Sequence, residues 1–278
     1  MKRRKFIHHS ALGMVGLSMA TPQNWFLGKK RELGIILNTV KKEMEENPEK
    51  TLEQLAELGY NYVEGGVYGK SAASYGKILK SLGLKSIAGG AAMGNFEKDL
   101  GKYLDQANAL NYAYIVCYWP WMSSATNLTL EECKKTAERL NRIGEKVKKE
   151  GFRLAWHNHD KEFADIGQMD KPFDVLMKNT DPELVTVEMD LYWVKKGNAD
   201  PVDLIKRYPG RFELFHVKDM DLTSERKMTC VGEGKINFKE IFKWSKKAGL
   251  KYPIVENEQS TNGIQCATIS YKSTFTAL

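Results

Sequence analysis

The feature that most constrains the fold is a regular alternation of short apolar segments with longer amphipathic ones. Eight segments are apolar and rich in β-branched or aromatic residues, and we expect them to be strands: 33–39, 62–64, 84–88, 112–118, 152–159, 184–190, 212–217 and 252–256. Eight strands, each followed by a helix or a long loop in about 250 residues, predict a single (β/α)8 barrel. An open doubly wound sheet is the alternative, but the chain lacks the G-x-G-x-x-G turn that such sheets often carry.

Sequence signals mark several of the helices expected between these strands. Asn47-Pro48 precedes a helix over 52–58 that ends at Gly59, and Asp200 is expected to cap a helix over 201–207. Further helices are expected over 75–82, 96–110, 130–149, 173–178 and 238–247. A last helix over 264–278 has the weakest pattern, because β-branched residues run through it.

The first twenty residues differ from the rest of the chain. They begin with Lys2-Arg3-Arg4-Lys5, continue with a small, apolar stretch over 11–20, and end in Ser18-Met19-Ala20, which resembles a cleavage site. This pattern is typical of an export signal of the twin-arginine type, and its apolar part is too short to span a membrane. We therefore predict an export signal over 1–20, a linker over 21–32, a barrel over 33–278 and a periplasmic location. The alternative is the frayed basic N-terminus of a cytosolic protein.

The net charge gives no reason to expect a nucleic-acid partner. The leader supplies four of the charges in a formal net charge of +7, which leaves +3 for the rest of the chain. The remaining lysines run along expected helices, where a solvated face explains them. We expect a small-molecule partner, no nucleic acid and no stable membrane span, and the sequence is compatible with a homo-oligomer.

The cysteines show no metal-binding spacing. They are Cys117, Cys133, Cys230 and Cys266, with no C-x-x-C pair among them. Export would permit disulfides, but Cys117 lies in an apolar strand and is expected to be a buried thiol. We predict no disulfide framework.

Chemically active residues gather where the later strands end, which is where a (β/α)8 barrel has its active site. The fifth to eighth strands each end in a pair two positions apart: His157 and His159, Glu188 and Asp190, His216 and Lys218, and Glu256 and Glu258. Residues i and i+2 of a strand face the same side, so the four strands are expected to deliver imidazole and carboxylate groups to one mouth. A solvated strand end explains any one pair equally well, but it does not explain all four.

Mixed histidine and carboxylate ligands suit one borderline divalent ion, such as Mn²⁺, Fe²⁺, Co²⁺ or Zn²⁺. The sequence offers neither the cysteine shell of structural zinc nor the all-oxygen shell of calcium. These strand ends therefore predict a metal site with ligands of both kinds.

Several segments together carry a family resemblance: 33–40, Trp156 to Phe163, Met189 to Val194, Tyr208 to Phe212, His216 to Met220, Val231 to Phe238 and Ile254 to Glu256. With them the chain resembles the sugar phosphate isomerase/epimerase group of the xylose isomerase-like TIM barrels, over nearly all of the segment that follows the leader. That group includes isomerases, epimerases, dehydratases and keto-sugar lyases, so the resemblance does not select a reaction.

The resemblance implies a divalent metal ion held by Asp190, His216 and Glu256. The fourth ligand is expected to be His157, which stands where many relatives have a glutamate, with Glu162 from the following loop as the alternative. The metal ion would stabilise an enediolate.

The resemblance also implies roles beside the metal. Glu162, His159 and Glu256 are the candidate bases. Lys218 is the candidate oxyanion stabiliser or proton donor, with a structural ion pair to Glu188 as the alternative. Trp193, Glu188 and Trp119 are expected to contact the sugar, and Trp121 is a further candidate for the wall of the site, whereas Trp156 faces away from the histidines.

The function expected first is a metal-dependent isomerase or epimerase acting on a sugar or keto sugar that carries no phosphate. The alternative is a lyase, dehydratase or hydratase acting on a 3-keto-glycoside or an inosose-like substrate. A non-catalytic carbohydrate-binding barrel is a third possibility. An AP-endonuclease-like activity is disfavoured, because three histidines outside the leader are too few for a trinuclear zinc cluster.

Overall fold

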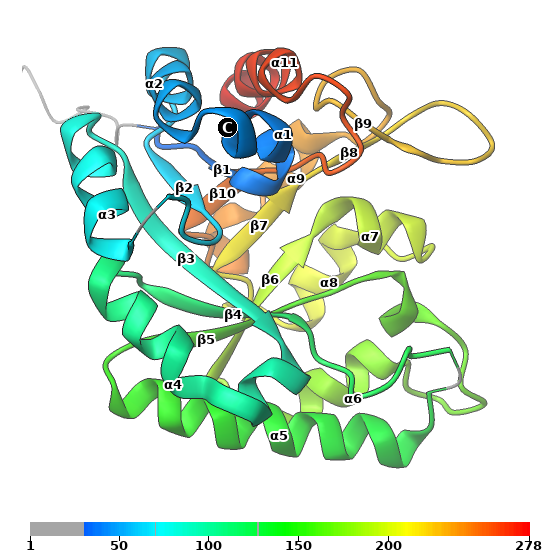
Figure 1. The fold of residues 1–278 in the computed structure, drawn as a ribbon. Coiled ribbons are helices and arrows are strands. Elements are labelled where there is room, and N and C mark those ends of the chain that lie inside the picture. The colour runs from blue at the N-terminus through cyan, green and yellow to red at the C-terminus, as the bar shows by residue number, and fades with distance from the viewer. Residues whose placement is uncertain (1–30, 70, 127) are drawn as a thin grey trace, which may run out of the picture. The chain divides into compact units, whose positions relative to one another are not determined.

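The centre of the fold is a closed barrel of eight parallel strands (Figure 1). The structure is a computed structural model that describes residues 31–69, 71–126 and 128–278. Residues Glu32–Leu278 form one compact unit, and the barrel lies within it. The predicted export signal and nearly all of the predicted linker lie outside the described residues.

The eight predicted strands are all present, and they close in the order β1-β10-β7-β6-β5-β4-β3-β2. Their bounds are β1 Gly34–Ile36, β2 Tyr62–Glu64, β3 Lys85–Ala92, β4 Tyr114–Trp119, β5 Arg153–His157, β6 Val185–Asp190, β7 Leu214–Val217 and β10 Tyr252–Val255. Since β1 pairs in parallel with both β2 and β10, the sheet has no free edge. The predicted (β/α)8 barrel is confirmed.

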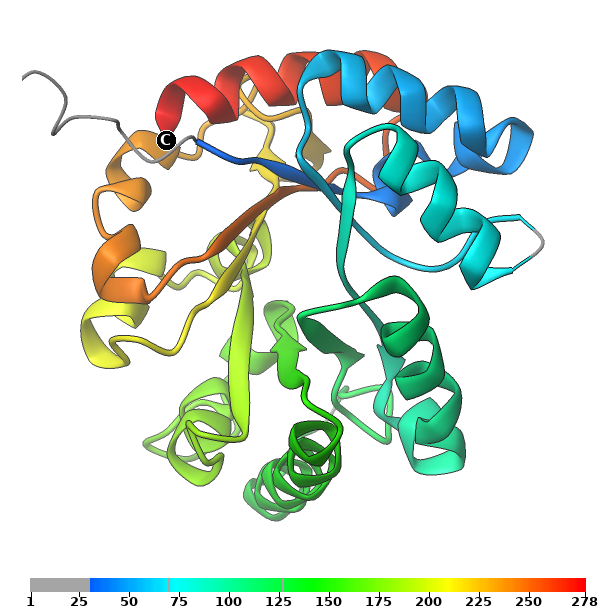
Figure 2. The ribbon, with the colours of Figure 1, turned by 90° about the vertical axis from the view of Figure 1, so that its left-hand side faces the viewer.

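Helices surround the strands (Figure 2). They are α1 Lys41–Glu46, α2 Pro48–Leu58, α3 Ala72–Ser81, α4 Met93–Leu110, α5 Leu130–Lys149, α6 Pro172–Asn179, α7 Leu191–Lys196, α8 Pro201–Arg207, α9 Phe238–Phe242, α10 Ser245–Ala248 and α11 Gly263–Ala277. Two 3-10 helices, η1 Leu37–Val40 and η2 Asp160–Phe163, and a hairpin of β8 Asp219–Met220 with β9 Met228–Thr229 complete the fold. Among the described residues no helix is both long enough and apolar enough to span a membrane.

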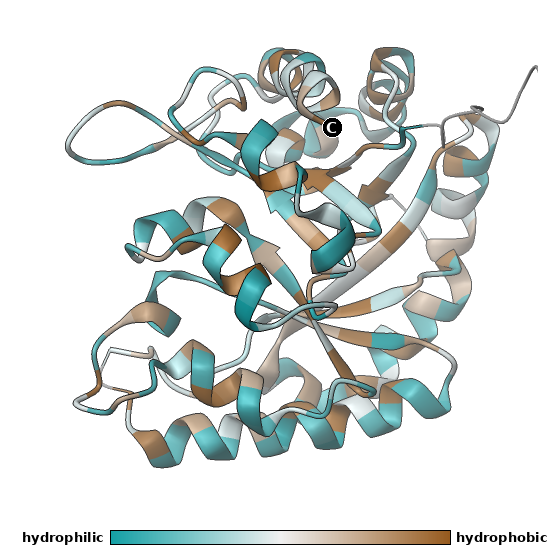
Figure 3. Ribbon diagram, turned by 180° about the vertical axis from the view of Figure 1, so that it is seen from behind, coloured by the Kyte–Doolittle hydropathy of each residue, from teal (hydrophilic) through white to brown (hydrophobic). Residues whose placement is uncertain are grey.

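The longest helix, α5, shows why the sequence signals were reliable there. Thr129 and Glu132 form a capping box at its start, which satisfies two otherwise free backbone N–H groups. Its apolar residues recur at helical spacing and are buried against the barrel. Figure 3 shows the result as apolar and polar residues alternating along α5.

Several predicted elements differ in extent from the structure. The strand expected over 33–39 ends at Ile36, where the chain turns into η1. The helix expected over 238–247 is divided into α9 and α10, and the hydroxyl of Ser245 donates a hydrogen bond to the Phe242 carbonyl at 2.5 Å where α9 ends. Strand β5 ends at His157 instead of continuing to His159, because the backbone N–H of His159 donates to the Glu162 carboxylate and the chain turns into η2.

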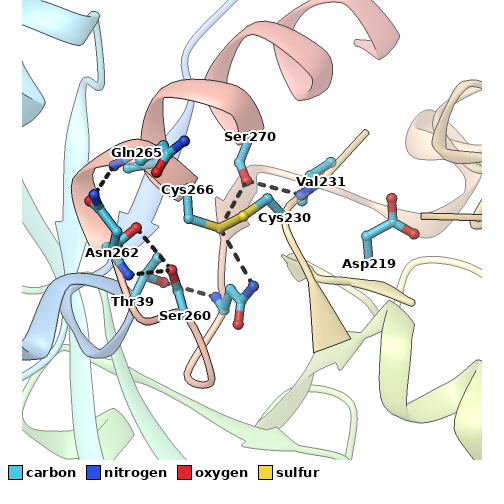
Figure 4. The surroundings of a disulfide bond; sticks show 12 residues. Thr39, Asp219, Cys230, Val231, Ser260, Asn262, Gln265, Cys266 and Ser270 are labelled. Atoms are coloured by element: carbon cyan, nitrogen blue, oxygen red, sulfur yellow. Dashed lines mark hydrogen bonds between the residues drawn. A yellow bond between two sulfur atoms is a disulfide. The ribbon is translucent and has the colours of Figure 1, made fainter. Parts of the chain in front are cut away.

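The prediction that the chain contains no disulfide is wrong. Cys230 and Cys266 form one, with their Cα atoms 5.3 Å apart, and it joins the segment after β9 to α11 (Figure 4). The two residues are 36 positions apart in the sequence, so only the packing of α11 beside this loop brings them together. Cys117 is a buried free thiol as predicted, and so is Cys133.

Candidate metal centre

The carboxyl ends of neighbouring strands place their side chains at one level of the barrel. In the parallel register His157 of β5 lies beside Glu188 of β6, and Asp190 of β6 lies beside His216 of β7. Glu256 follows β10 directly, and its backbone N–H donates to the carbonyl of the last residue of β7. The later strand ends therefore meet at one mouth, as the spacing predicted.

Four of these residues form a buried group that could hold a metal ion. His157, Asp190, His216 and Glu256 each offer one ligand atom, and these atoms lie within 4.8 Å of one another. All four side chains are buried. The structure thus brings together the four predicted ligands, and His157 instead of Glu162 is the fourth member of the group.

Unpaired polar atoms indicate that this group is built for a ligand. Asp190 Oδ2, His216 Nδ1 and Glu256 Oε2 are buried and make no hydrogen bond of acceptable geometry, although His216 Nδ1 and Glu256 Oε2 are only 2.8 Å apart. Buried polar atoms are nearly always satisfied in native proteins. Two imidazole nitrogens and two carboxylate oxygens left facing one another fit a borderline divalent ion.

The balance of buried charge also favours a cation. Four carboxylates are buried here, those of Glu64, Glu188, Asp190 and Glu256. The described cationic groups in contact with them are the Lys218 ammonium and the histidine rings. Since uncompensated buried charge is costly, a divalent ion would offset the excess of carboxylates.

Sequence reasoning missed Glu64. This residue ends β2 and is fully buried, with Oε2 3.2 Å from His216 Nε2 and Oε1 accepting a hydrogen bond of 2.7 Å from the Tyr118 hydroxyl. The sequence signal for Glu64 is weak, because β2 has only three residues and the residue two positions after Glu64 is Gly66, which cannot form a pair of active side chains. Pairs of chemically active residues two positions apart mark the later strands and not β2.

The two histidines of the group have different proton affinities. Burial, with the nearby ring of His216, lowers the pKa of His157 well below its usual range, so its ring is neutral at pH 7. Burial also acts to lower the pKa of His216, but the carboxylates of Glu188, Glu64 and Glu256 outweigh it and raise that pKa well above the usual range. Binding of a metal ion would displace the second proton of His216.

Lys218 lies on the same carboxylates as the candidate ligands. Its Nζ is 3.1 Å from Asp190 Oδ2, 2.8 Å from Glu256 Oε2 and 3.3 Å from Glu258 Oε2. Burial acts to lower the pKa of Lys218, but these three carboxylates outweigh it and raise the pKa above its ordinary value. The alternative of an ion pair with Glu188 is wrong: the partners of Lys218 are the other three carboxylates, and Glu188 pairs with histidines.

His159 lies among aromatic rings beside the group. Its ring centroid is 4.9 Å from that of His157, 5.1 Å from that of Trp119 and 5.4 Å from that of Trp193. Burial, with the charge of Lys218, lowers the pKa of His159 to about 4. Its Nδ1 is buried without a hydrogen-bond partner, so at neutral pH the ring holds a nitrogen that can accept a proton.

Glu162 points to a different set of partners. Its Oε1 accepts a hydrogen bond of 2.7 Å from the Trp121 indole, and its Oε2 accepts one of 2.9 Å from the backbone N–H of His159. Burial raises the pKa of Glu162 to about 7. Both oxygens are therefore used in holding η2 and the loop after β4, and Trp121 is a buried partner of Glu162.

A cavity of about 310 Å³ opens onto the group. The residues that line it are Ile36, Leu37, Asn38, Gly65, Gly66, Tyr68, Tyr118, His157, His159, His216, Glu256 and Glu258. Trp119, Trp193 and Glu188, which were predicted to contact the substrate, are not among these described lining residues. The tryptophans contact His159, and Glu188 contacts the histidines.

The sequence of this chain matches that of a known protein family. The family model of the xylose isomerase-like TIM barrel matches residues 52–265. The chain belongs to that family. The predicted family resemblance is confirmed, and with it the (β/α)8 class of the barrel.

One curated protein is similar to this chain in sequence. An inosose dehydratase from Clostridium perfringens is 31% identical over 149 residues, which are 48% of this chain and 49% of that protein. The match therefore spans about half the length of that relative.

Solved structures of the same fold extend the comparison. A sugar phosphate isomerase/epimerase from Parabacteroides distasonis has a TM-score of 0.75 at 24% identity and covers 89% of this chain and 94% of its own. A third protein, IolI, solved with a bound zinc atom, has a TM-score of 0.71 at 15% identity and covers 89% of this chain and 98% of its own. At these identities the two structures show the shared fold alone.

Proposed function

We propose that this protein is a divalent-metal-dependent enzyme that removes the proton next to the carbonyl group of an uncharged keto sugar or cyclic polyol ketone. The observation that carries the proposal is the buried group of His157, Asp190, His216 and Glu256, in which three nitrogen or oxygen atoms make no hydrogen bond and which faces a sugar-sized cavity. A bound metal ion would polarise the carbonyl and stabilise the negative charge that develops on its oxygen.

The chain's own residues supply the proton transfers. His159 lines the cavity with a neutral ring, so its Nδ1 can accept the proton from the carbon next to the carbonyl. Glu258 also lines the cavity, and the Lys218 ammonium donates to its Oε2 at 3.3 Å. This pair can deliver a proton to a departing hydroxyl group.

Charge argues for an uncharged substrate. No lysine or arginine is among the described residues that line the cavity, whereas two glutamates are. The Lys218 ammonium is fully buried and is occupied by three carboxylates. A phosphate group would meet these carboxylates without a lysine or arginine side chain to pair with it, which is unfavourable.

Loss of water is the outcome that we favour after proton removal. The Lys218–Glu258 pair offers the proton donor that elimination requires. The inosose dehydratase is also more similar in sequence to this chain, at 31% identity, than the sugar phosphate isomerase/epimerase, at 24%. Isomerisation or epimerisation is the second candidate, supported by the fold similarity to a sugar phosphate isomerase/epimerase. Both reactions begin with the same proton transfer.

Export remains a proposal, based on the twin-arginine pattern of residues 1–20. The Cys230–Cys266 disulfide supports it, because disulfides persist in oxidising compartments such as the periplasm.

The decisive experiment combines metal analysis with substrate incubation in D₂O. We expect about one bound divalent ion per chain, deuterium exchange next to the carbonyl of an inosose or a ketose, and a product lighter by one water. Exchange without water loss would favour the isomerase, and absence of both metal and exchange would overturn the proposal.

Variants assign the base. His159→Gln should lower kcat by about 10²–10⁴-fold with metal content unchanged, as loss of a general base does. Glu162→Gln tests a second of the predicted bases, and a loss of that size confined to the Glu162 variant would show that the base is misassigned.

A further inference from the structure

Glu188 lies between the two histidines of the candidate metal centre. Its Oε2 is 3.2 Å from Nδ1 of His157, and its Oε1 is 3.3 Å from Nε2 of His216. The side chain is fully buried. One carboxylate therefore contacts both imidazole rings. In each ring it contacts the nitrogen that lies farther from Asp190 and Glu256.

An ionised carboxylate accepts hydrogen bonds and donates none. A ring nitrogen that donates to Glu188 carries hydrogen, which leaves the lone pair of a metal-bound ring on the other nitrogen. These other nitrogens are Nε2 of His157, 3.7 Å from Asp190 Oδ2, and Nδ1 of His216, 2.8 Å from Glu256 Oε2. The two rings thus present opposite nitrogens to the same centre.

We propose that Glu188 is a positioning residue that fixes His157 in the tautomer that binds the metal ion, and that it does the same for His216 together with Glu64, which accepts the hydrogen bond of His216 Nε2. The proposal rests on the metal site of the proposed function and assigns to Glu188 a role other than contact with the sugar. Carboxylates that accept a hydrogen bond from a metal-binding histidine set its tautomer and raise its basicity. Here Glu188, on β6, lies between His157 on β5 and His216 on β7; it makes the hydrogen bond of His157, and it shares the Nε2 of His216 with Glu64.

Glu64 cannot replace Glu188 in this role. Glu64 contacts His216 through Oε2, but its Oε1 accepts from the Tyr118 hydroxyl. Among the hydrogen bonds of the described residues, that of His157 Nδ1 is made to Glu188. Loss of the Glu188 carboxylate would leave the tautomer of His157 undetermined, whereas His216 would keep one acceptor.

The first test measures Zn²⁺ affinity of Glu188→Gln by competition with a chromophoric chelator. Glutamine keeps the shape but offers one accepting oxygen and one donating amide, so it can satisfy only one of the two ring N–H groups. We expect the Kd for Zn²⁺ to rise by about 10–100-fold, as for other residues that orient a metal ligand.

The matched control is Glu213→Gln. Glu213 is a buried glutamate at the amino end of β7, where it contacts Tyr114, Arg153 and Lys251. Its substitution removes a buried carboxylate far along the strand from the mouth, and the Kd for Zn²⁺ should stay within about threefold of wild type, since it touches no ligand. Equal losses in both variants would overturn the proposal.

The second test reads the tautomers directly and needs no variant. In ¹⁵N-histidine spectra of the Zn²⁺-loaded wild type, we expect His157 to carry hydrogen on Nδ1 and His216 on Nε2. In Glu188→Gln at least one of these signatures should be lost. Hydrogen on Nε2 of His157 in the wild type would overturn the proposal even if the variant does not fold.

The two hypotheses fail in different ways. If the wild type binds no divalent ion, the proposed function fails. If the wild type binds Zn²⁺ but Glu188→Gln binds it equally tightly, the metal site stands and the role of Glu188 is refuted.

Discussion

Single residues at the mouth of this barrel serve structure and chemistry together. Asp190 shows this clearly: its Oδ1 accepts a hydrogen bond of 2.8 Å from the backbone N–H of Trp193 and so caps α7, while its Oδ2 makes no hydrogen bond and lies 3.1 Å from Lys218 Nζ in the candidate metal centre. A substitution at Asp190 would therefore disturb both the helix start and the ligand set. Residues with one role give cleaner tests.

Glu162 allows such a test through pH. Burial raises its pKa from 4.5 to about 7, so between these values the folded protein keeps a proton that the unfolded chain has lost. The contribution of Glu162 to stability is thus highest below pH 4.5 and falls as the pH rises to about 7. By linkage the loss is about 3 kcal/mol. In Glu162→Gln this loss should be absent.

Urea unfolding of the metal-free protein and of Glu162→Gln at pH 5 and pH 8 measures the effect. The free energy of unfolding of the variant, relative to wild type, should rise with pH by an amount on the order of 3 kcal/mol. Groups other than Glu162 titrate in both proteins and cancel in the difference. A difference that does not change with pH would show that Glu162 is ionised throughout.

At the scale of elements, the strands were predictable because each is a short run of β-branched and aromatic residues closed by a turn signal. Helices α5 and α8 were predicted with their observed bounds, α5 from apolar residues at helical spacing and α8 from Asp200 at its N-terminus. The short elements were not predicted. Helix α7 has six residues and begins where Asp190 caps it, which becomes visible only once the strand end is placed.

The candidate site, like the elements, was predictable in part. The spacing of two residues directed the four pairs at the strand ends to one side, and the family resemblance selected His157, Asp190, His216 and Glu256 among them as the metal ligands. It could not separate Glu188, which turns to the histidines, from a residue that faces the cavity. Nor could it place Glu162, since the direction of a loop side chain depends on partners such as Trp121.

The disulfide is expected to stabilise the packing of α11, the helix with the weakest sequence pattern. It ties α11 to the loop after β9, which Asp219 holds separately by accepting hydrogen bonds from the backbone N–H groups of Gly232, Gly234 and Ile236. Replacing both cysteines with serine should lower the free energy of unfolding by about 2–4 kcal/mol, because the cross-link restricts the unfolded chain. For a domain of this size, that corresponds to a Tm lower by about 5–15 °C.

Calorimetry with and without dithiothreitol provides the control. Reduction should lower the Tm of the wild type to that of the double serine variant and should leave the variant unchanged, since Cys117 and Cys133 are free thiols. Equal Tm values for the oxidised wild type and the variant would show that the cross-link adds no stability.

At the scale of the whole molecule, the barrel buries more carboxylates than cationic groups at its mouth. All eight strands are hydrogen-bonded into the sheet, and the ends of β2, β6 and β10 bring buried carboxylates together at one mouth. Burying these groups opposes folding unless cations compensate them. A bound divalent ion should therefore stabilise the entire barrel, because the strands that carry its ligands belong to one closed sheet.

Metal removal tests this coupling. Mn²⁺, Co²⁺ or Zn²⁺ at about 100 times its Kd should add about 2.7 kcal/mol to the free energy of unfolding of the chelator-treated protein. The corresponding rise in Tm is about 5–10 °C. Mg²⁺ and Ca²⁺ should raise it less, since they prefer shells made of oxygen ligands alone.

Variants decide whether the candidate group is responsible for that rise. His216→Ala removes a ligand and should abolish the metal-dependent rise in Tm, whereas Glu213→Gln, at the other end of the same strand, should retain it. The comparison uses the difference in Tm with and without metal for each variant, so that loss of packing at His216 does not enter. If His216→Ala kept the full rise, the ions would be binding elsewhere on the chain, and the buried group would be a network of ion pairs whose charges Lys218 and the histidines balance without a metal ion.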